Sequence, residues 1–414
     1  MERGLKVGAA GACALVLVAC GGSGGGSGDG NAPAASPGTS TASTTSAPRP
    51  VVSPSLLDVG GYPTVPRPPL GLSGNPALGA TVDAQHMADF VLGPWDVDDA
   101  LIGTYLNTYY VLNSASVLKQ LGPEGIAAAA AQNGMINGFA SARESSKTGD
   151  GKEAGQEAMV NAVLRFPDPA AATAASAAMG EAAIRQAIKG VTPTAVAIPG
   201  HPDAVASTYP FTPNGATKPR ATVRSFTPRG PYVFMHFVQA VDGPDRATAL
   251  TGKMIEAQGK AIDGFTPAAD LAAVPLDPTG LLAKTLPAAA PEPAKNAVYA
   301  TRGAEHFQTN PVGSAQLFSD TGTTEVAMGS TNVYQTKDDG AAVMITNAFS
   351  QEMTSSGMAT ADTVTALPDS HCYALPQAFY CVAPAGRYAI EARSSQLADV
   401  HQQLSAQYVM LTAK

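Results

Sequence analysis

The chain has few charged residues, few aromatic residues and no run of basic residues. Only 14% of its 414 residues are charged, 6% are aromatic, and the single tryptophan is Trp95. The formal net charge is −8 at pH 7. An acidic chain without a basic cluster lacks the electrostatic footprint that attracts nucleic acid or anionic lipid. The composition therefore argues against nucleic acid as a partner.

Long apolar runs are also missing, since no stretch after residue 20 approaches the ~20 residues that span a bilayer. Residues 1–19 have a basic start, Arg3 and Lys6, followed by small and apolar residues from Val7 to Val18. This is the pattern of a secretory signal peptide, too short to be a spanning helix. Because residues 1–19 carry a net charge of +1 (Arg3, Lys6 and Glu2), their removal leaves the mature chain near −9.

The signal peptide ends in Leu17-Val18-Ala19-Cys20, which resembles the lipobox of bacterial lipoproteins. The resemblance implies that Cys20 receives a diacylglyceryl group and becomes the new N-terminus. Two or three acyl chains give durable anchoring. We therefore expect a protein anchored to the extracytoplasmic face of the cell membrane through acyl chains such as palmitate. The alternative is an ordinary secreted protein in which this cysteine occurs by chance.

Cysteine is scarce, with four in the whole chain. Cys13 leaves with the signal peptide and Cys20 is the expected lipidation site, so Cys372 and Cys381 remain. An even pair in an exported protein indicates a disulfide more than a metal site or a nucleophile. The segment between the two cysteines could form a hairpin that brings both sulfur atoms to facing positions.

Composition divides the rest of the chain. Residues 20–50 consist mainly of Gly, Ser, Thr, Ala and Pro, which predicts a flexible tether with a reach of roughly 30 Å. The glycine-rich run 21–30 has GxGxxG-like spacing, but no strand precedes it and no helix follows, which argues against nucleotide binding. The segments predicted after the tether are a Pro-rich extended lead-in (51–121), a first α+β domain (122–265), a Pro/Ala-rich linker (266–297) and a second α+β domain with the disulfide (298–414).

Three segments carry a family resemblance. They are Leu57–Gly71 (LDVGGYPTVPRPPLG), Leu276–Pro287 (LDPTGLLAKTLP) and Arg302–Phe307 (RGAEHF). Together they resemble a family of mycobacterial and related actinobacterial cell-envelope lipoproteins of uncharacterised function. The resemblance implies an envelope location and a two-part architecture. It implies no catalytic residue.

Hydrophobic periodicity predicts two similar series of elements. The first series has helices over 123–133, 168–189 and 244–262, and strands over 135–143, 158–166, 204–208, 221–226 and 232–240. The second has helices over 313–319, 338–352 and 395–409, and strands over 324–328, 331–336, 363–366, 372–375, 379–382 and 387–391. Residues 80–120 have no single assignment.

Two local matches indicate a duplication. Residues 163–171 match residues 333–341, and residues 229–232 match residues 385–388, which gives a period near 160 residues. A period of this length indicates two similar domains and not a solenoid. Paired hairpins separated by helices predict antiparallel sheets with helices on one face. The expected fold class is therefore α+β, with two similar ferredoxin-like domains.

No complete catalytic constellation is present, so no catalytic residue is predicted. The segment Ser116–Lys119 fits SxxK, but the SGN of residues 73–75 and the KTG of residues 147–149 have the wrong order and spacing for a penicillin-binding enzyme. No histidine pair has HxH or HxxxH spacing, so no metal or cofactor is expected. The six histidines are His86, His201, His236, His306, His371 and His401.

His306 is the best single candidate for ligand binding, together with Arg302 in the same segment. The alternative is a purely structural role for this histidine. His236 lies in a predicted strand and is expected to be either a surface residue or a hydrogen-bonded sheet residue. The aspartate pairs at 98–99 and 338–339 are expected to cap helices or to lie in solvated turns.

Three functional hypotheses follow. The first is a non-enzymatic envelope lipoprotein that binds a lipid, a glycolipid, a wall component or a protein partner. The second is an envelope-modifying enzyme whose active-site groups are far apart in sequence. The third is assembly with another protein through an exposed sheet edge or the Pro-rich segment.

Overall fold

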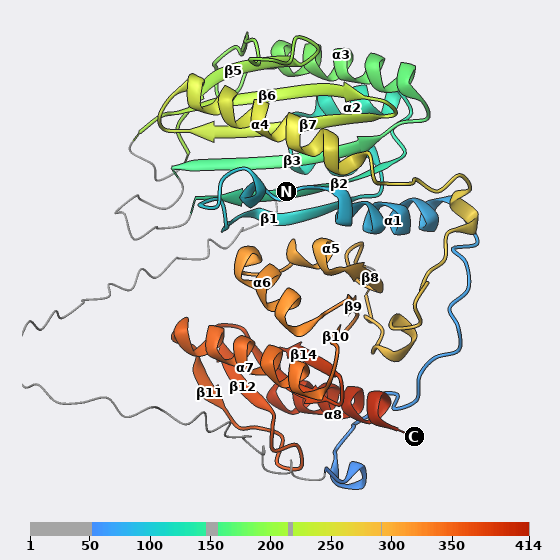
Figure 1. Cartoon of the computed structure of the whole chain (residues 1–414). Helices are drawn as coiled ribbons and strands as arrows, with labels where there is room; N and C mark the ends of the chain where they lie inside the picture. Colours follow the sequence, from blue (N-terminus) through green and yellow to red (C-terminus); the bar gives the residue numbers. More distant parts are fainter. Residues whose placement is uncertain (1–51, 146–155, 214–217, 291, 414) are drawn as a thin grey trace, which may run out of the picture. The chain divides into compact units, whose positions relative to one another are not determined.

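The computed structural model describes residues 52–145, 156–213, 218–290 and 292–413 (Figure 1). The predicted signal peptide, Cys20 and the tether lie outside the described residues. Residues 50–414 form one compact unit. The hydrophobic core clusters of the described residues all lie within this unit, so it carries its own core.

Seven antiparallel strands form the first sheet, in the order β1-β2-β3-β7-β6-β5-β4. The strands are β1 (Gly103–Leu112), β2 (Asn137–Glu144), β3 (Glu157–Arg165), β4 (Thr194–Ala195), β5 (Val205–Phe211), β6 (Arg220–Arg229) and β7 (Tyr232–Ala240). Its helices are α1 (Pro76–Met87), α2 (Glu124–Gln132), α3 (Pro169–Arg185) and α4 (Pro244–Ile262). Short 3-10 helices lie at Ala88–Phe90, Pro94–Asp96 and Ala115–Gln120.

Helices cover both faces of the first sheet, whereas the sequence predicted helices on one face. Leu164 and Met235 belong to one core cluster, together with residues of α2 and α3. Val163 and Phe234, their neighbours along the strands, belong to another cluster with residues of α4. Because successive side chains of a strand point to opposite faces, apolar residues at successive positions need cover on both sides.

The second sheet also has seven antiparallel strands, in the order β11-β12-β13-β14-β10-β9-β8. The strands are β8 (Ala297–Ala300), β9 (Glu325–Met328), β10 (Thr331–Gln335), β11 (Ala359–Ala361), β12 (His371–Leu375), β13 (Ala378–Ala385) and β14 (Tyr388–Ser394). Its helices are α5 (Thr301–Glu305), α6 (Pro311–Thr321), α7 (Asp339–Ser355) and α8 (Leu397–Thr412).

The two sheets have the same topology, which confirms the predicted duplication. In chain order, β1 to β7 occupy the same positions in the first sheet as β8 to β14 occupy in the second. Equivalent helices also begin alike: Asp168 accepts a hydrogen bond from Ala171 N (2.8 Å) before α3, and Asp338 accepts one from Ala341 N (2.8 Å) before α7. The chain is therefore an α+β protein with two similar domains.

Several elements differ from the prediction. The first sheet takes β1 from the segment that was expected to precede the first domain, and α3 ends at Arg185, before residue 189. β1 has a bulge in which Leu106 and Thr108 have positive φ angles (52° and 62°), and its first half is largely exposed. Such a strand lacks the regular alternation by which strands are recognised.

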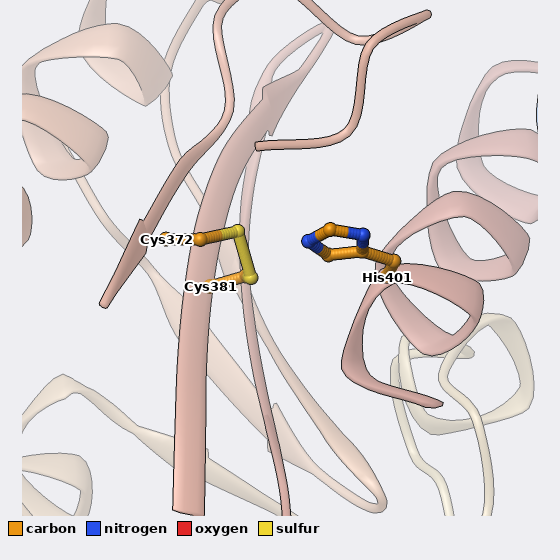
Figure 2. Close-up of side chains that lie close together, drawn as sticks. All are labelled: Cys372, Cys381 and His401. Carbon is orange, nitrogen blue, oxygen red and sulfur yellow. A yellow bond between two sulfur atoms is a disulfide. The ribbon is translucent and has the colours of Figure 1, made fainter. Parts of the chain in front are cut away.

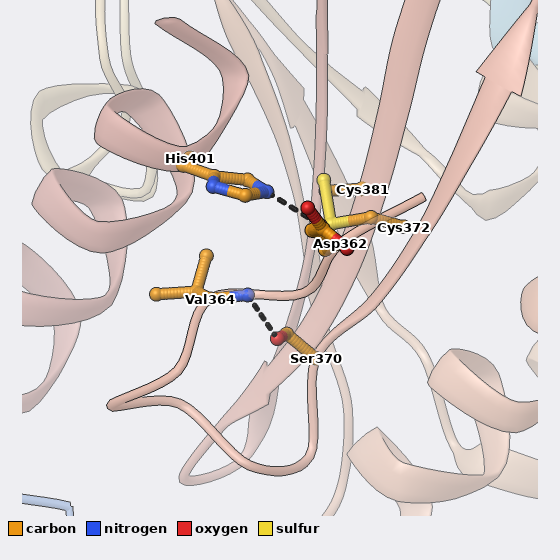
Figure 3. Close-up of a disulfide and its surroundings, with 6 residues drawn as sticks. All are labelled: Asp362, Val364, Ser370, Cys372, Cys381 and His401. Carbon is orange, nitrogen blue, oxygen red and sulfur yellow. Dashed lines mark hydrogen bonds between the residues drawn. A yellow bond between two sulfur atoms is a disulfide. The ribbon is translucent and has the colours of Figure 1, made fainter. Parts of the chain in front are cut away.

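Residues 363–366 are not a strand, since the edge strand β11 ends at Ala361. The N–H of Val364 donates to Ser370 Oγ (3.2 Å), as Figure 3 shows. A backbone group that bonds a nearby side chain belongs to a turn and not to a sheet ladder. The apolar Val364 is nevertheless buried, which accounts for the strand-like pattern.

The Pro-rich segment and the linker lie side by side. The backbone N–H of Arg67 donates to Ala283 O (2.9 Å), and its Nη2 donates to Leu282 O (2.5 Å). Leu276 N donates to Gly71 O (3.0 Å). Two of the three segments that carry the family resemblance are therefore hydrogen-bonded to each other.

Candidate functional site

A pocket of about 380 Å³ lies against the second sheet. Strands β10, β13 and β14, helix α7 and the segment after α5 contribute to it, and Tyr109 of β1 also lines it. Sites for small molecules commonly measure about 300–1,000 Å³ and combine apolar walls with a few convergent polar groups. This cavity, called the Glu391 pocket below, is the candidate functional site.

The Glu391 carboxylate of β14 is held by three donors from the neighbouring strands. The hydroxyls of Tyr334 and Tyr380 donate to its two oxygens, the second at 2.7 Å, and Asn332 Nδ2 donates at 3.2 Å. Asn332 is the direct cross-strand partner of Glu391. Burial, reinforced by the Glu391 charge, raises the pKa of both tyrosines well above the usual value. Both hydroxyls therefore stay protonated and donate.

Charges of both signs surround this network. Burial lowers the pKa of Lys295, whose Nζ donates to Asn332 Oδ1 (3.3 Å). Burial raises the pKa of Glu352 on α7, and the Thr309 side chain partly offsets that rise. Arg393 also lines the pocket, two residues after Glu391 and hence on the same face of β14. The pocket thus offers fixed donors, acceptors and both charges.

The first domain has apolar residues at the equivalent positions. When Asp168 is aligned with Asp338, and the β6–β7 hairpin with the β13–β14 hairpin, the strand registers pair equivalent residues in both sheets. The equivalent pairs are Tyr334 and Leu164, Asn332 and Ala162, and Glu391 and Met235. The three first-domain residues are fully buried in a hydrophobic core cluster. One scaffold thus has an apolar core in one copy and a polar cavity in the other.

His306 is fully buried, and both ring nitrogens have partners within the chain. Nε2 lies 3.1 Å from Ala88 O and 3.0 Å from Val91 O, and Nδ1 lies 3.0 Å from Ser141 Oγ. Since carbonyls only accept, Nε2 carries the proton and Nδ1 accepts from the serine. Burial lowers the pKa of His306 to about 3, so the ring is neutral. This placement supports the structural interpretation of His306.

Arg302 lies in an acidic cluster beside this histidine. It forms ion pairs with Asp96 and with Glu305 (2.9 Å), and Asp89 accepts a hydrogen bond from Gly303 N (2.7 Å). Burial raises the pKa of Asp89 to about 6 and that of Glu305 to about 7. Arg302 is thus paired with two carboxylates, and its charge also acts on Asp89, so its partners lie within the chain.

Asp89→Asn should remove a pH-dependent part of the stability. Because the pKa of Asp89 in the folded chain (about 6) exceeds its ordinary value of 3.8, this carboxyl stabilises the fold fully below about pH 4. That contribution is lost as the pH rises through about 6. The asparagine keeps an acceptor for Gly303 N and carries no charge. We expect the unfolding free energy of Asp89→Asn, relative to the wild type, to rise by about 2 kcal/mol between pH 4 and pH 7.

Urea denaturation at a series of pH values measures this difference. Asp245→Asn is the control, since Asp245 is exposed in the first turn of α4. If the profiles of Asp89→Asn and the wild type run parallel from pH 4 to pH 7, the assignment of the raised pKa to Asp89 is wrong.

His236 is buried and not at the surface. Its Nδ1 lies 3.2 Å from Ser225 Oγ, and burial lowers its pKa to about 3. Asp98, expected in a solvated turn, instead forms an ion pair with Arg246 of α4. Asp338, by contrast, caps α7 as predicted. These polar residues therefore have structural partners within the chain.

The structure contains the Cys372–Cys381 disulfide. The two cysteines face each other on β12 and β13, and His401 of α8 directs its ring toward them (Figure 2). His401 Nε2 donates to Asp362 O (2.7 Å), as Figure 3 shows. Because the sulfur atoms are bonded to each other, they offer no thiolate to a metal. Such a disulfide is typical of proteins in oxidising, extracytoplasmic compartments.

Comparison with known proteins identifies the family. Residues 70–276 match the family model described as the domain of unknown function (DUF7373) N-terminal, and residues 281–414 match the corresponding C-terminal model. The chain therefore belongs to the DUF7373 family. A search of curated proteins found no match.

Among solved structures, the chain resembles the extracellular domain of PknH from Mycobacterium tuberculosis. The match has 12% sequence identity and a TM-score of 0.28, and it covers 41% of this chain and 93% of the other. Within the described residues, no helix is both long and apolar enough to cross a membrane.

Proposed function

We propose that this chain is a non-enzymatic, lipid-anchored envelope protein. In this proposal, the Glu391 pocket binds a polyhydroxylated group, such as the saccharide part of a glycolipid or wall component. The main support is the contrast between the two domains: polar Tyr334, Asn332 and Glu391 occupy positions that are apolar core in the first domain. Asn332 and Glu391 are half-buried and line the cavity, so this polar cluster is accessible to a ligand, which favours a binding role.

The pocket chemistry suits a saccharide. Each sugar hydroxyl both donates and accepts hydrogen bonds. The pocket presents a carboxylate, side-chain amides and charged groups of both signs in fixed positions, which can bind such hydroxyls. Tyr109, Phe307 and Phe349 add aromatic surface on which the C–H face of a sugar ring can pack. Tyr109 and Phe307 also contact each other, with ring centroids 4.4 Å apart. Their mutual packing restricts both rings before any ligand enters.

The anchor is the second part of the proposal. Cys20→Ala should move the protein from the membrane fraction to the soluble fraction, or leave an uncleaved precursor of higher mass. The reason is that the acyl chains are attached through the Cys20 sulfur and cleavage precedes this residue. Fractionation of cells with immunoblotting measures both results, and Cys13→Ala is the matched control. Normal anchoring of Cys20→Ala would contradict the lipoprotein assignment.

Glu391→Met should weaken saccharide binding at least about tenfold while leaving the fold intact. The substitution gives the second sheet the residue that the first sheet has at the equivalent position, Met235. We expect native mass spectra of residues 50–414, purified after export by an actinobacterial host, to show a bound small molecule on the wild type. The same spectra of Glu391→Met should show unliganded protein. Titration with methyl glycosides should show at least about a tenfold loss of affinity, which corresponds to 1.4 kcal/mol.

Glu325→Met is the control for this experiment, because Glu325 is a half-buried carboxylate on β9 that does not line the pocket. Circular dichroism establishes that both variants are folded. If the wild type carries no small molecule and binds no glycoside, or if both variants bind like the wild type, the proposed binding site is wrong.

A second candidate function is an envelope-modifying enzyme. The observation that favours it is the presence of two carboxyl groups in one pocket, of which Glu352 has a raised pKa. Two carboxyl groups in one site are the arrangement that general acid–base chemistry on a glycosidic bond requires. Release of p-nitrophenol from nitrophenyl glycosides by the wild type, lost in Glu352→Gln, would favour this function over simple binding.

A further inference from the structure

A second concave surface adjoins the Glu391 pocket. It has a volume of about 640 Å³ and lies between the Pro-rich segment, α1 and residues 276–296. Its apolar lining consists of Leu70, Leu78, Val82, Leu276, Leu282 and Pro293, and polar residues that include Arg67, Gln85 and Glu292 form its rim. Leu78 is 41% exposed, although leucine side chains gain by leaving water. We call this surface the Leu78 groove.

The groove and the pocket share a wall. Lys295 lines both cavities, Ala294 lines the pocket, and Pro293 lines the groove. Gln85 of α1 donates from Nε2 to Pro293 O (2.7 Å), which fixes this wall against the helix. The Lys295 ammonium donates a hydrogen bond to Asn332 Oδ1, and Asn332 lines the Glu391 pocket. One molecule that is polar at one end and apolar at the other could therefore occupy both cavities.

We infer that the Leu78 groove holds the alkyl chain of an amphiphilic ligand whose polar head lies in the Glu391 pocket. This inference rests on the proposed function and narrows its ligand to a glycolipid. A free saccharide would leave the leucine-lined surface exposed to water. A simple fatty acid would bring no hydroxyl groups to the polar residues around Glu391. An alkyl glycoside matches both surfaces at once.

The test uses alkyl β-D-glucosides below their micelle concentrations, with residues 50–414, the unit that carries its own core. Isothermal titration calorimetry compares methyl, hexyl, octyl and decyl glucosides. We expect the affinity of the wild type to rise about twofold to fourfold per added methylene, because each buried methylene lowers the free energy of binding. A flat series would overturn the inference.

Leu78→Trp should fill the groove and abolish the rise of affinity with chain length, while methyl glucoside still binds. Val312→Trp is the matched control, since Val312 is 44% exposed in the first turn of α6 and lines neither cavity. It should keep the chain-length dependence of the wild type. An unchanged dependence in Leu78→Trp would place the chain elsewhere and overturn the inference.

Changing the headgroup of the ligand tests the proposed saccharide site separately from the inferred alkyl-chain site. Octyl glucoside and octyl sulfate have the same chain and differ only in the head. We expect the wild type to prefer the glucoside, and Glu391→Met to lose that preference while keeping the chain-length dependence. If the wild type shows no preference but a clear chain-length dependence, the saccharide site is wrong and the groove assignment stands.

Discussion

Replacement of Arg143 by methionine should destabilise the folded chain by at least about 3 kcal/mol. Arg143 of β2 is 1% exposed, and its guanidinium donates to three backbone carbonyls. The distances are 3.3 Å to Ile102 O, 2.9 Å to His306 O and 2.8 Å to Gln308 O. The guanidinium also lies over the Trp95 ring, 5.4 Å from its centroid. Methionine fills most of the volume but removes the donor of all three carbonyls, of which those of His306 and Gln308 are buried.

The same substitution should weaken ligand binding, because Arg143 fixes the segment that forms one wall of the Glu391 pocket. Phe307 and Gln308 line the pocket, and Gln308 Nε2 donates to Tyr334 OH (3.3 Å). Arg143→Lys keeps the charge but loses the planar fork of donors, so an intermediate effect is expected. Hydrogen exchange of residues 306–309 should increase in both variants.

Urea denaturation measures the change in stability, and Arg185→Met is the control. Arg185 is an exposed residue of α3 whose ion pair with Glu181 spans one helical turn, and such pairs contribute about 0.5 kcal/mol or less. A loss below about 1 kcal/mol in Arg143→Met would contradict the bonding role assigned to this arginine.

Much of the scaffold follows from local pattern. Helix α4 has the predicted bounds, Pro244–Ile262, because a proline at its first position and a regular apolar face specify it locally. The duplication could be inferred from the repeated capping aspartates Asp168 and Asp338, since an N-cap is a property of a few neighbouring residues. Such features depend on short-range interactions that a sequence displays directly.

The candidate site depends on long-range contacts that the sequence does not display. Lys295 comes from the end of the predicted linker, yet it shares a pocket with Glu391 of β14. One signal was present: β10 and β14 carry Asn332 and Glu391 where β3 and β7 carry apolar residues. Comparison of the two copies, position by position, could have found it. The sequence could not show that His306 is structural. Its hydrogen-bond partners, Ser141 and a carbonyl of the segment after α1, are over 160 residues away in sequence.

Asp83→Ala should cost about 3–5 kcal/mol, because it leaves the half-buried Arg165 guanidinium and two further donors without their buried acceptor. Asp83 of α1 is 2% exposed and accepts three hydrogen bonds. The donors are Arg165 Nη1 (2.7 Å), Asn137 Nδ2 (2.8 Å) and Ala268 N (2.9 Å). This carboxylate thus joins α1 to β2, β3 and the segment after α4. Its removal should loosen α1, and with it the helical side of the Leu78 groove.

A double-mutant cycle isolates the ion pair from the other losses. Asp83→Leu combined with Arg165→Met replaces both charges by apolar groups, so the double variant should lose less stability than the sum of the single variants. The expected coupling is about 1–3 kcal/mol. Glu256→Ala with Lys260→Ala, an exposed pair on α4, serves as the reference cycle and should give about 0.5 kcal/mol or less. If the stability losses of the two single variants add up to that of the double variant, Asp83 and Arg165 are not coupled. Helix α1 would then be held by its apolar contacts, and the wall of the Leu78 groove would tolerate removal of the Asp83 charge.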